Sequence, residues 1–123
     1  MGGIYSWNHG QACCAGSRIF VHSKVYDEFL TKFTKKALSL KVGDPFEKDS
    51  YQGPQVSQVQ YDRIMSYIDA GKTEGATVHV GGERHGDEGY FIQPTIFTNT
   101  TPDRKSTRLN SSHSGESRMP SSA

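Results

Sequence analysis

The sequence lacks a long apolar run, and no segment approaches the roughly 20 apolar residues that cross a bilayer. It also lacks an excess of either charge, because 14 basic residues stand against 13 acidic ones for a net charge of +1. Nucleic acids and anionic membrane surfaces attract strongly basic proteins, so this balance predicts neither partner. The chain has 123 residues, 33% of them hydrophobic, which is enough for one modest core.

Cysteine is scarce as well, and the two that are present, Cys13 and Cys14, are neighbours. Adjacent cysteines form a disulfide only with strain, which favours a reducing compartment and predicts a cytoplasmic location. The five histidines stand at positions 9, 22, 79, 85 and 113, and no two are four residues apart. This spacing predicts no metal site.

Aromatic residues are missing from the end of the chain, since all 13 of them lie at or before Phe97. Residues 104–123 hold seven serines and only three apolar residues. Such a segment cannot bury enough surface to offset its ordering entropy. We therefore predict one globular unit over residues 1–103 and a disordered tail over 104–123, whose sequence also looks like a translated cloning linker and so is expected to be non-native.

The strongest periodic pattern predicts an amphipathic helix that begins with Ser23 as its cap and ends at residues 42–45. Four apolar residues recur at every fourth position and so share one helix face; they are Val25, Phe29, Phe33 and Ala37. This helix is expected to cover a sheet.

The remaining pattern predicts further helices and strands. A capping box of Ser57 and Gln60 begins a second long helix, which Gly71 ends. A short helix is expected over residues 7–16 and strands over 19–21, 77–80 and 90–97, with Pro94 placing the last strand at an edge or breaking it. The order of elements predicts an α/β fold with an open sheet and covering helices.

Cys13 is the candidate for chemistry, because small residues surround it and would let a ligand approach the sulfur. A thiolate is the reactive form, and a helix start or a nearby cation makes it less costly to form. A buried cysteine that packs as a small apolar group is nevertheless the commoner case. From the residues alone, both interpretations stay open.

Residues 8–18, NHGQACCAGSR, resemble the active-site segment of the NAD(P)-dependent aldehyde dehydrogenases, in which the cysteine of G-Q-x-C is the nucleophile. The resemblance extends over about residues 7–101, in the family's order and spacing. Its further blocks are VGDPF at 42–46, GPQV at 53–56, GKTEGA at 71–76, GG at 81–82 and GYFIQPT at 89–95. It is closest to the broad-substrate mitochondrial and cytosolic branch, and it implies that residues 1–103 form part of an aldehyde dehydrogenase catalytic domain.

The resemblance implies a role for each matching residue. The Cys13 thiolate would attack an aldehyde, and the thiohemiacetal would lose hydride to NAD or NADP, with NAD favoured, leaving a thioester that water hydrolyses with the help of a glutamate base. Gln60 and Arg63 match positions that contact the cofactor ribose, although a capping residue and a solvated charge explain them equally well. Cys14 matches a small non-catalytic neighbour, with redox buffering as its alternative. The parent enzyme is expected to be a homo-oligomer.

Several family features are not found in these 123 residues. We expect the nucleotide-binding half, the oxyanion amide and the base glutamate to lie upstream, and the E-E-I-F-G-P block that should follow residue 103 is replaced by the tail. Ser6 also stands where the family has an apolar residue, which leaves the packing around Cys13 open. The sequence therefore predicts an inactive fragment of a cytoplasmic enzyme, or of a mitochondrial one if a targeting segment precedes it.

Two other functions remain as alternatives. A cysteine hydrolase would use Cys13 as the nucleophile and a histidine such as His22 or His79 as its base. A non-catalytic module would instead pack against a longer relative through an exposed sheet edge and uncovered helix faces.

Overall fold

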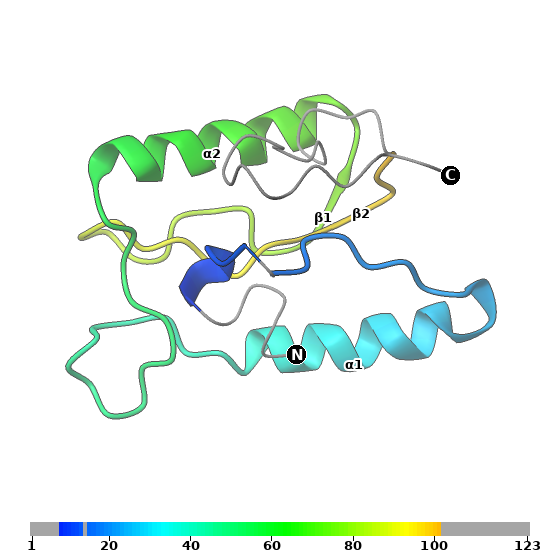
Figure 1. The fold of residues 1–123 in the computed structure, drawn as a ribbon, viewed down its shortest axis with the longest axis horizontal. Helices are drawn as coiled ribbons and strands as arrows, with labels where there is room; N and C mark the ends of the chain where they lie inside the picture. The colour runs from blue at the N-terminus through cyan, green and yellow to red at the C-terminus, as the bar shows by residue number, and fades with distance from the viewer. Residues whose placement is uncertain (1–7, 14, 102–123) are drawn as a thin grey trace.

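A computed structural model describes residues 8–13 and 15–101 of the chain. Two helices, α1 (Tyr26–Leu38) and α2 (Gln58–Thr73), lie on either side of a small sheet (Figure 1). The sheet consists of β1 (Thr77–Val80) and β2 (Ile96–Thr98), which pair in antiparallel fashion. Two 3-10 turns, η1 (Asn8–Gly10) and η2 (Ser23–Val25), precede these elements.

Helix α1 covers one face of the sheet, as its periodicity predicts. Phe33 and Ala37 are buried and form a cluster with Val80 of β1 and Ile96 of β2. The ring of Phe29, one turn earlier, stacks on that of Phe33 with the centroids 5.4 Å apart. The predicted apolar face is therefore confirmed for its last three members, and it supplies two of the four buried residues of this cluster.

The start of this helix differs from the prediction. Ser23 is not the cap, because Val25 is the N-cap of α1 and forms no side-chain cap hydrogen bond. His22 caps the 3-10 turn that precedes the helix, and its Nδ1 accepts a hydrogen bond from the Lys24 N–H at 3.2 Å. Residues 23–25 form the 3-10 turn η2, and the α-helix begins only at Tyr26. Val25 consequently lies outside α1 and stays half exposed.

Helix α2 covers the other face of the sheet. The Ser57 hydroxyl accepts a hydrogen bond from the Gln60 N–H at 3.2 Å, which confirms the predicted start of the helix. Ile68 and Gly71 are buried, and a Cβ on Gly71 would meet the Phe97 ring at 2.9 Å, so the glycine permits close packing against β2. Gly71 does not end the helix, which continues two residues further to Thr73.

Neighbouring residues of β2 pack against different helices, because successive side chains of a strand point to opposite faces of the sheet. Ile96 packs on α1 and Phe97 on α2. In the pairing, Phe97 lies opposite Val78 and Ile96 opposite Val80, with an irregularity between the two β1 positions. On the N-terminal side of Pro94, an isolated bridge between Arg84 and Ile92 continues the pairing. The strand predicted over 90–97 is therefore broken at the proline, which cannot donate a hydrogen bond to a neighbouring strand.

The first predicted helix and strand are wrong. Among the described residues from 8 to 16, the turn η1 is the only helical element, and residues 15–22 have no regular structure. A strand needs a hydrogen-bonded neighbour, and the apolar run 19–21 has none among the described residues, so Phe20 is left 90% exposed. Position 7, Ser6, Cys14 and the predicted tail lie outside the described residues.

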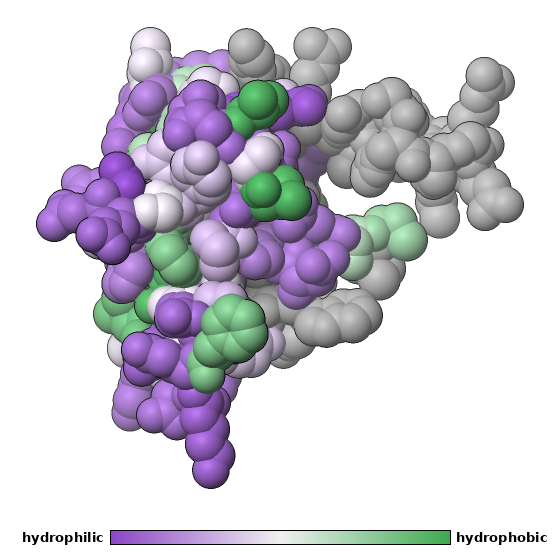
Figure 2. Space-filling model, turned by 90° about the vertical axis from the view of Figure 1, so that its left-hand side faces the viewer, coloured by the Kyte–Doolittle hydropathy of each residue, from purple (hydrophilic) through white to green (hydrophobic). Residues whose placement is uncertain are grey.

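The surface is mixed in character. Figure 2 shows a mainly hydrophilic face on which hydrophobic side chains form separate spots rather than one patch. In the part of the chain that the structure describes, no helix combines the length and the apolar character needed to cross a membrane.

Candidate active site

The candidate nucleophile follows a left-handed turn. Asn8, His9 and Gly10 have φ values of 50°, 58° and 72°, a region that glycine adopts freely, asparagine tolerates and other residues rarely enter. The turn is closed by a hydrogen bond from the Gln11 N–H to the Asn8 carbonyl at 2.9 Å. Such backbone strain concentrates at functional sites, so this turn is a specific feature rather than an ordinary loop.

Cys13 is a free thiol on the surface. Cys13 lies in a second turn, which a hydrogen bond of 2.9 Å from the Ala15 N–H to the Ala12 carbonyl closes. Neither its sulfur nor its own N–H forms a hydrogen bond with any described residue. A Cβ added at Gly16 would meet nothing within 4 Å. The sulfur is therefore accessible, and the N–H beside it is available to a ligand oxygen.

His9 connects the turn to the rest of the fold. Its Nδ1 lies 3.1 Å from the Nε2 of Gln52 and 3.1 Å from the Nε2 of Gln55. Burial lowers the pKa of His9 below the usual 6.5, so the ring is neutral at pH 7. The two glutamines were not predicted as site residues, although Gln55 belongs to the Gly-Pro-Gln-Val block.

A cavity of about 250 Å³ lies between this turn and α2. His9 and Gln11 line one side of it, and Ile64 and Ile68 of α2 line another. Cys13 is not part of this wall. The structure thus brings the turn that precedes the cysteine and helix α2 to the same cavity, with apolar side chains on the helix side.

Gln60 and Arg63 lie in the first two turns of α2, three residues apart and therefore on one side of the helix. Gln60 is half-buried and Arg63 is exposed. Neither the carboxamide nor the guanidinium forms a hydrogen bond within the described residues. Both groups are free to bind a polar ligand. They do not line the cavity that the turn and α2 share.

The histidines that a hydrolase would need are engaged elsewhere. His22 accepts the Lys24 N–H, and His79 Nε2 lies 2.8 Å from the hydroxyl of Thr34 on α1. Over residues 8–13 and 15–101, no histidine forms a hydrogen bond with the Cys13 sulfur. The cysteine hydrolase alternative therefore has no base in the described structure.

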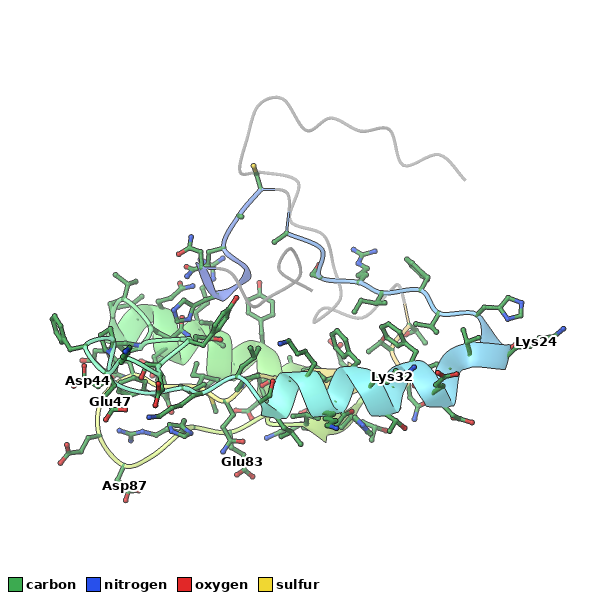
Figure 3. The ribbon with its side chains drawn as sticks, turned by 90° about the horizontal axis from the view of Figure 1, so that it is seen from below. Lys24, Lys32, Asp44, Glu47, Glu83 and Asp87 are labelled. Atoms are coloured by element: carbon green, nitrogen blue, oxygen red, sulfur yellow. The ribbon has the colours of Figure 1, made fainter. Side chains whose placement is uncertain are left out.

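Several charged side chains lie at the two ends of the molecule. Figure 3 shows Asp44, Glu47 and Asp87 at one end of the molecule and Lys24 at the other, while the ribbon of residues 8–22 lies to one side of both helices. Among the residues that the structure describes, no three histidine, cysteine, aspartate or glutamate side chains gather in a way that could hold a metal ion.

Comparison with known proteins gives a consistent result. The model of the aldehyde dehydrogenase family matches residues 3–110. An aldehyde dehydrogenase of Agaricus bisporus is 74% identical over 99 residues, which are 80% of this chain and 20% of that protein. A mitochondrial aldehyde dehydrogenase of Arabidopsis thaliana, family 2 member B4, is 54% identical over 97 residues, or 79% of this chain and 18% of that protein.

The fold has the same relatives. The NAD+ complex of an aldehyde dehydrogenase from Bacillus cereus superposes with a TM-score of 0.82 at 45% identity, covering 88% of this chain and 22% of that one. An NAD-dependent aldehyde dehydrogenase from Sinorhizobium meliloti gives 0.82 at 33% identity, covering 88% and 21%. The chain thus spans about a fifth of the length of the relatives that it matches.

Proposed function

Because this chain belongs to the aldehyde dehydrogenase family, we propose that it carries the nucleophile of an enzyme that oxidises aldehydes to carboxylic acids with NAD(P). The observation that carries the proposal is Cys13, an exposed free thiol directly after a strained turn in the G-Q-x-C sequence. Covalent catalysis requires a nucleophile that the substrate can reach, and this sulfur meets that requirement.

The sulfur would react as a thiolate. It forms a bond to the aldehyde carbon, while the carbonyl π electrons move to oxygen and create an oxyanion near the Cys13 N–H. When the carbonyl re-forms, hydride leaves the carbon, and a bound oxidised nicotinamide supplies the acceptor for it. The acyl group then remains on Cys13 as a thioester. Attack by water releases the carboxylic acid and returns the thiol.

Gln60 and Arg63 would hold the cofactor. Hydroxyl groups of a ribose need both donors and acceptors, and a carboxamide beside a guanidinium offers them from one side of α2. Neither side chain has a hydrogen-bond partner among the described residues, which supports this role. NAD is favoured over NADP, in keeping with the NAD+ complex of the Bacillus cereus relative. We further propose a cytoplasmic homo-oligomer as the setting of the whole enzyme.

The decisive experiment places residues of this chain within a longer relative. Residues 8–101 replace the matching segment of the Bacillus cereus enzyme, whose 45% identity and shared fold make the exchange feasible. We expect NAD-dependent aldehyde oxidation in this chimera. Cys13→Ser should lower its kcat by more than about 10⁴-fold, the scale for removing a covalent nucleophile. Cys14→Ser, the adjacent matched control, should change kcat by no more than a few-fold.

NAD+ binding by the chimera reports that it has folded. Activity that survives Cys13→Ser would contradict the role of Cys13, and so would a chimera that binds NAD+ but oxidises no aldehyde. The 123-residue chain alone is expected to be inactive, because the family's base glutamate is not among its residues. Cofactor-dependent aldehyde oxidation by the purified chain that Cys13→Ala abolishes would overturn that expectation.

A further inference from the structure

We propose that His9 is a pH-sensitive positioning residue: its neutral ring, through Nδ1, holds the turn that precedes Cys13 on the fold, and protonation releases the turn. The link lies in the residues 8–13 and 41–55 of this chain and can be tested in it directly. Only its importance for aldehyde oxidation rests on the proposed function.

The connection at His9 is narrow. Among the described residues, the two hydrogen bonds from Gln52 and Gln55 to His9 are the ones that join residues 8–22 to a distant part of the chain. Every other hydrogen bond of this segment joins residues at most three positions apart, such as those from Gln11 to Asn8 and from Ala15 to Ala12. Loss of the His9 contact would therefore free the turn without breaking the sheet or either helix.

The glutamine side of the link is firmly placed. The Gln52 carbonyl accepts the Gly43 N–H at 3.0 Å, and the Gln52 N–H donates to the Lys41 carbonyl at 3.2 Å. The Gln55 N–H donates to the Tyr90 carbonyl at 2.8 Å, and Gln55 is buried. The backbone of Gln52 is thus fixed to the segment that follows α1, and the backbone of Gln55 is fixed to the segment that precedes β2.

The chemistry of the contact selects one form of the ring. In the arrangement seen, two amide NH₂ groups face Nδ1, and with this orientation Nδ1 offers its lone pair while the hydrogen of the neutral ring lies on Nε2. Protonation would place a hydrogen on Nδ1 against these donors. Rotating the carboxamides would bring their oxygens, which are buried without a partner in the present arrangement, to the ring and would in turn leave their NH₂ groups without acceptors. The ¹⁵N shifts of the ring distinguish these two arrangements.

Among the residues that the structure describes, the surroundings of the ring offer no charge that would stabilise its protonated form. Besides His9, the cavity beside the turn is lined by glutamines, by Ile64 and Ile68 of α2, and by uncharged residues between positions 92 and 97. No titratable side chain from any of these elements faces the imidazole there. Charging the ring therefore favours states in which water reaches it, and the released turn is such a state.

The direction of the pH effect follows. Burial lowers the pKa of His9 in the folded chain below 6.5, its usual value. A group of this kind contributes fully to the docked state above pH 6.5, and its contribution is lost as the pH falls through the lowered pKa. The turn is thus held at neutral pH and released in acid.

Nuclear magnetic resonance on the full 123-residue chain tests both parts. The ¹⁵N shifts of the His9 ring should show an unprotonated Nδ1 and a protonated Nε2 at pH 7. Hydrogen exchange of the Gln11 and Ala15 amides, corrected for intrinsic rates, should lose several-fold of its protection as His9 titrates. The Glu74 amide, which donates to Ala70 in α2, should keep its protection over the same range.

Two variants separate the proposal from a merely structural role. His9→Asn tolerates the positive φ and can place an amide oxygen near the Nδ1 position without titrating, so protection should persist and become independent of pH. Gln55→Glu places a carboxylate beside the ring, so the pKa of His9 should rise and the loss of protection should move to higher pH.

Several outcomes would overturn the proposal. They are a hydrogen on Nδ1 at pH 7, protection in the unmodified chain that does not follow the His9 titration, and an unchanged acid transition in His9→Asn. None of these readouts requires aldehyde oxidation. Failure of the chimera to turn over aldehyde would refute the proposed function and leave the His9 link intact. An active chimera together with failure of the magnetic resonance tests would refute only the His9 link.

Discussion

The helix-and-sheet scaffold and the segment that carries Cys13 are held in place by different forces. Phe33, Ala37, Val80 and Ile96 bury apolar side chains between α1 and the sheet. In contrast, none of the described residues between 8 and 22 is buried, and the segment is joined to the fold by hydrogen bonds to His9. The scaffold is therefore stabilised by removing apolar surface from water, and the nucleophile segment by a local polar contact.

This difference separates folding from positioning. A segment with few buried contacts opens at a smaller free energy than the core around it. Changes to the core should therefore alter the free energy of unfolding, whereas changes at His9 should alter the order of the turn at nearly constant global stability. Substitutions in the core and in the segment of residues 8–22 test whether global stability and the order of the turn change independently.

Phe33→Ala should have the largest effect on stability. It removes a buried ring that stacks on Phe29 and touches both strands' cluster residues, and such a deletion costs about 3 kcal/mol or more. Urea denaturation followed by circular dichroism measures the change. Leu38→Ala, on the same helix but 70% exposed, is the control and should stay within about 0.5 kcal/mol. Equal losses in the two variants would show that α1 does not pack as described.

A pair of glycines tests the hairpin that carries the sheet. Gly81 and Gly86 have similar φ values of 68° and 71°, but an added Cβ at Gly81 would collide with the Pro94 carbonyl, whereas one at Gly86 meets nothing within 4 Å. Gly86→Ala should cost about 1 kcal/mol from backbone strain alone. Gly81→Ala should cost about 1–3 kcal/mol beyond that, because backbone must move.

Thermal or urea unfolding of the two glycine variants isolates the collision as their difference. The Gln11 and Ala15 amides should retain their relative protection in Gly86→Ala, since that substitution touches neither the turn nor the glutamines. Identical stability of the two variants would contradict the close approach of Gly81 to Pro94.

The scaffold was largely predictable because its signals are local. The spacing of Phe29, Phe33 and Ala37 predicts the face of α1, and Ser57 predicts the start of α2; both are confirmed. The start of α1 was predicted wrongly, since the sequence does not reveal that residues 23–25 form a 3-10 turn. In each successful case, the residues that decide the structure lie within a few positions of one another.

The site was predictable in its sequence motif but not in its geometry. Positive φ values at Asn8 and His9 turn the chain where a helix was expected, and only Gly10 gives a local signal for such a conformation. His9 and Gln52 are 43 residues apart, so no periodicity connects them. The roles of Cys13, Gln60 and Arg63 remain predictions that the experiments above address.

The smallest effect is expected at the ion pair between Lys41 and Glu47, whose charged atoms lie 2.7 Å apart on the surface. The hydrogen bond and the charge of Glu47 raise the pKa of Lys41 above 10.5, so the pairing favours the charged ammonium, and this preference is lost as the pH rises through the raised pKa. Glu47→Gln should lower the pKa of Lys41, which ¹³C resonance of the carbon next to Nζ reports. Asp49→Asn, the matched control, should lower it less, because the charge of Asp49 is the weaker cause.

Glu47→Gln should leave unfolding unchanged, because solvent screens exposed ion pairs. It also bears on the comparison between scaffold and nucleophile segment. The Lys41 carbonyl accepts the N–H groups of Tyr51 and Gln52 through the backbone, so the loop that presents Gln52 to His9 does not depend on the Lys41 ammonium. The acid transition of the turn should therefore have the same midpoint in Glu47→Gln as in the unmodified chain. A shifted midpoint would mean that surface charge reaches the His9 link, and that the nucleophile segment is less isolated from the charged loop than its contacts indicate.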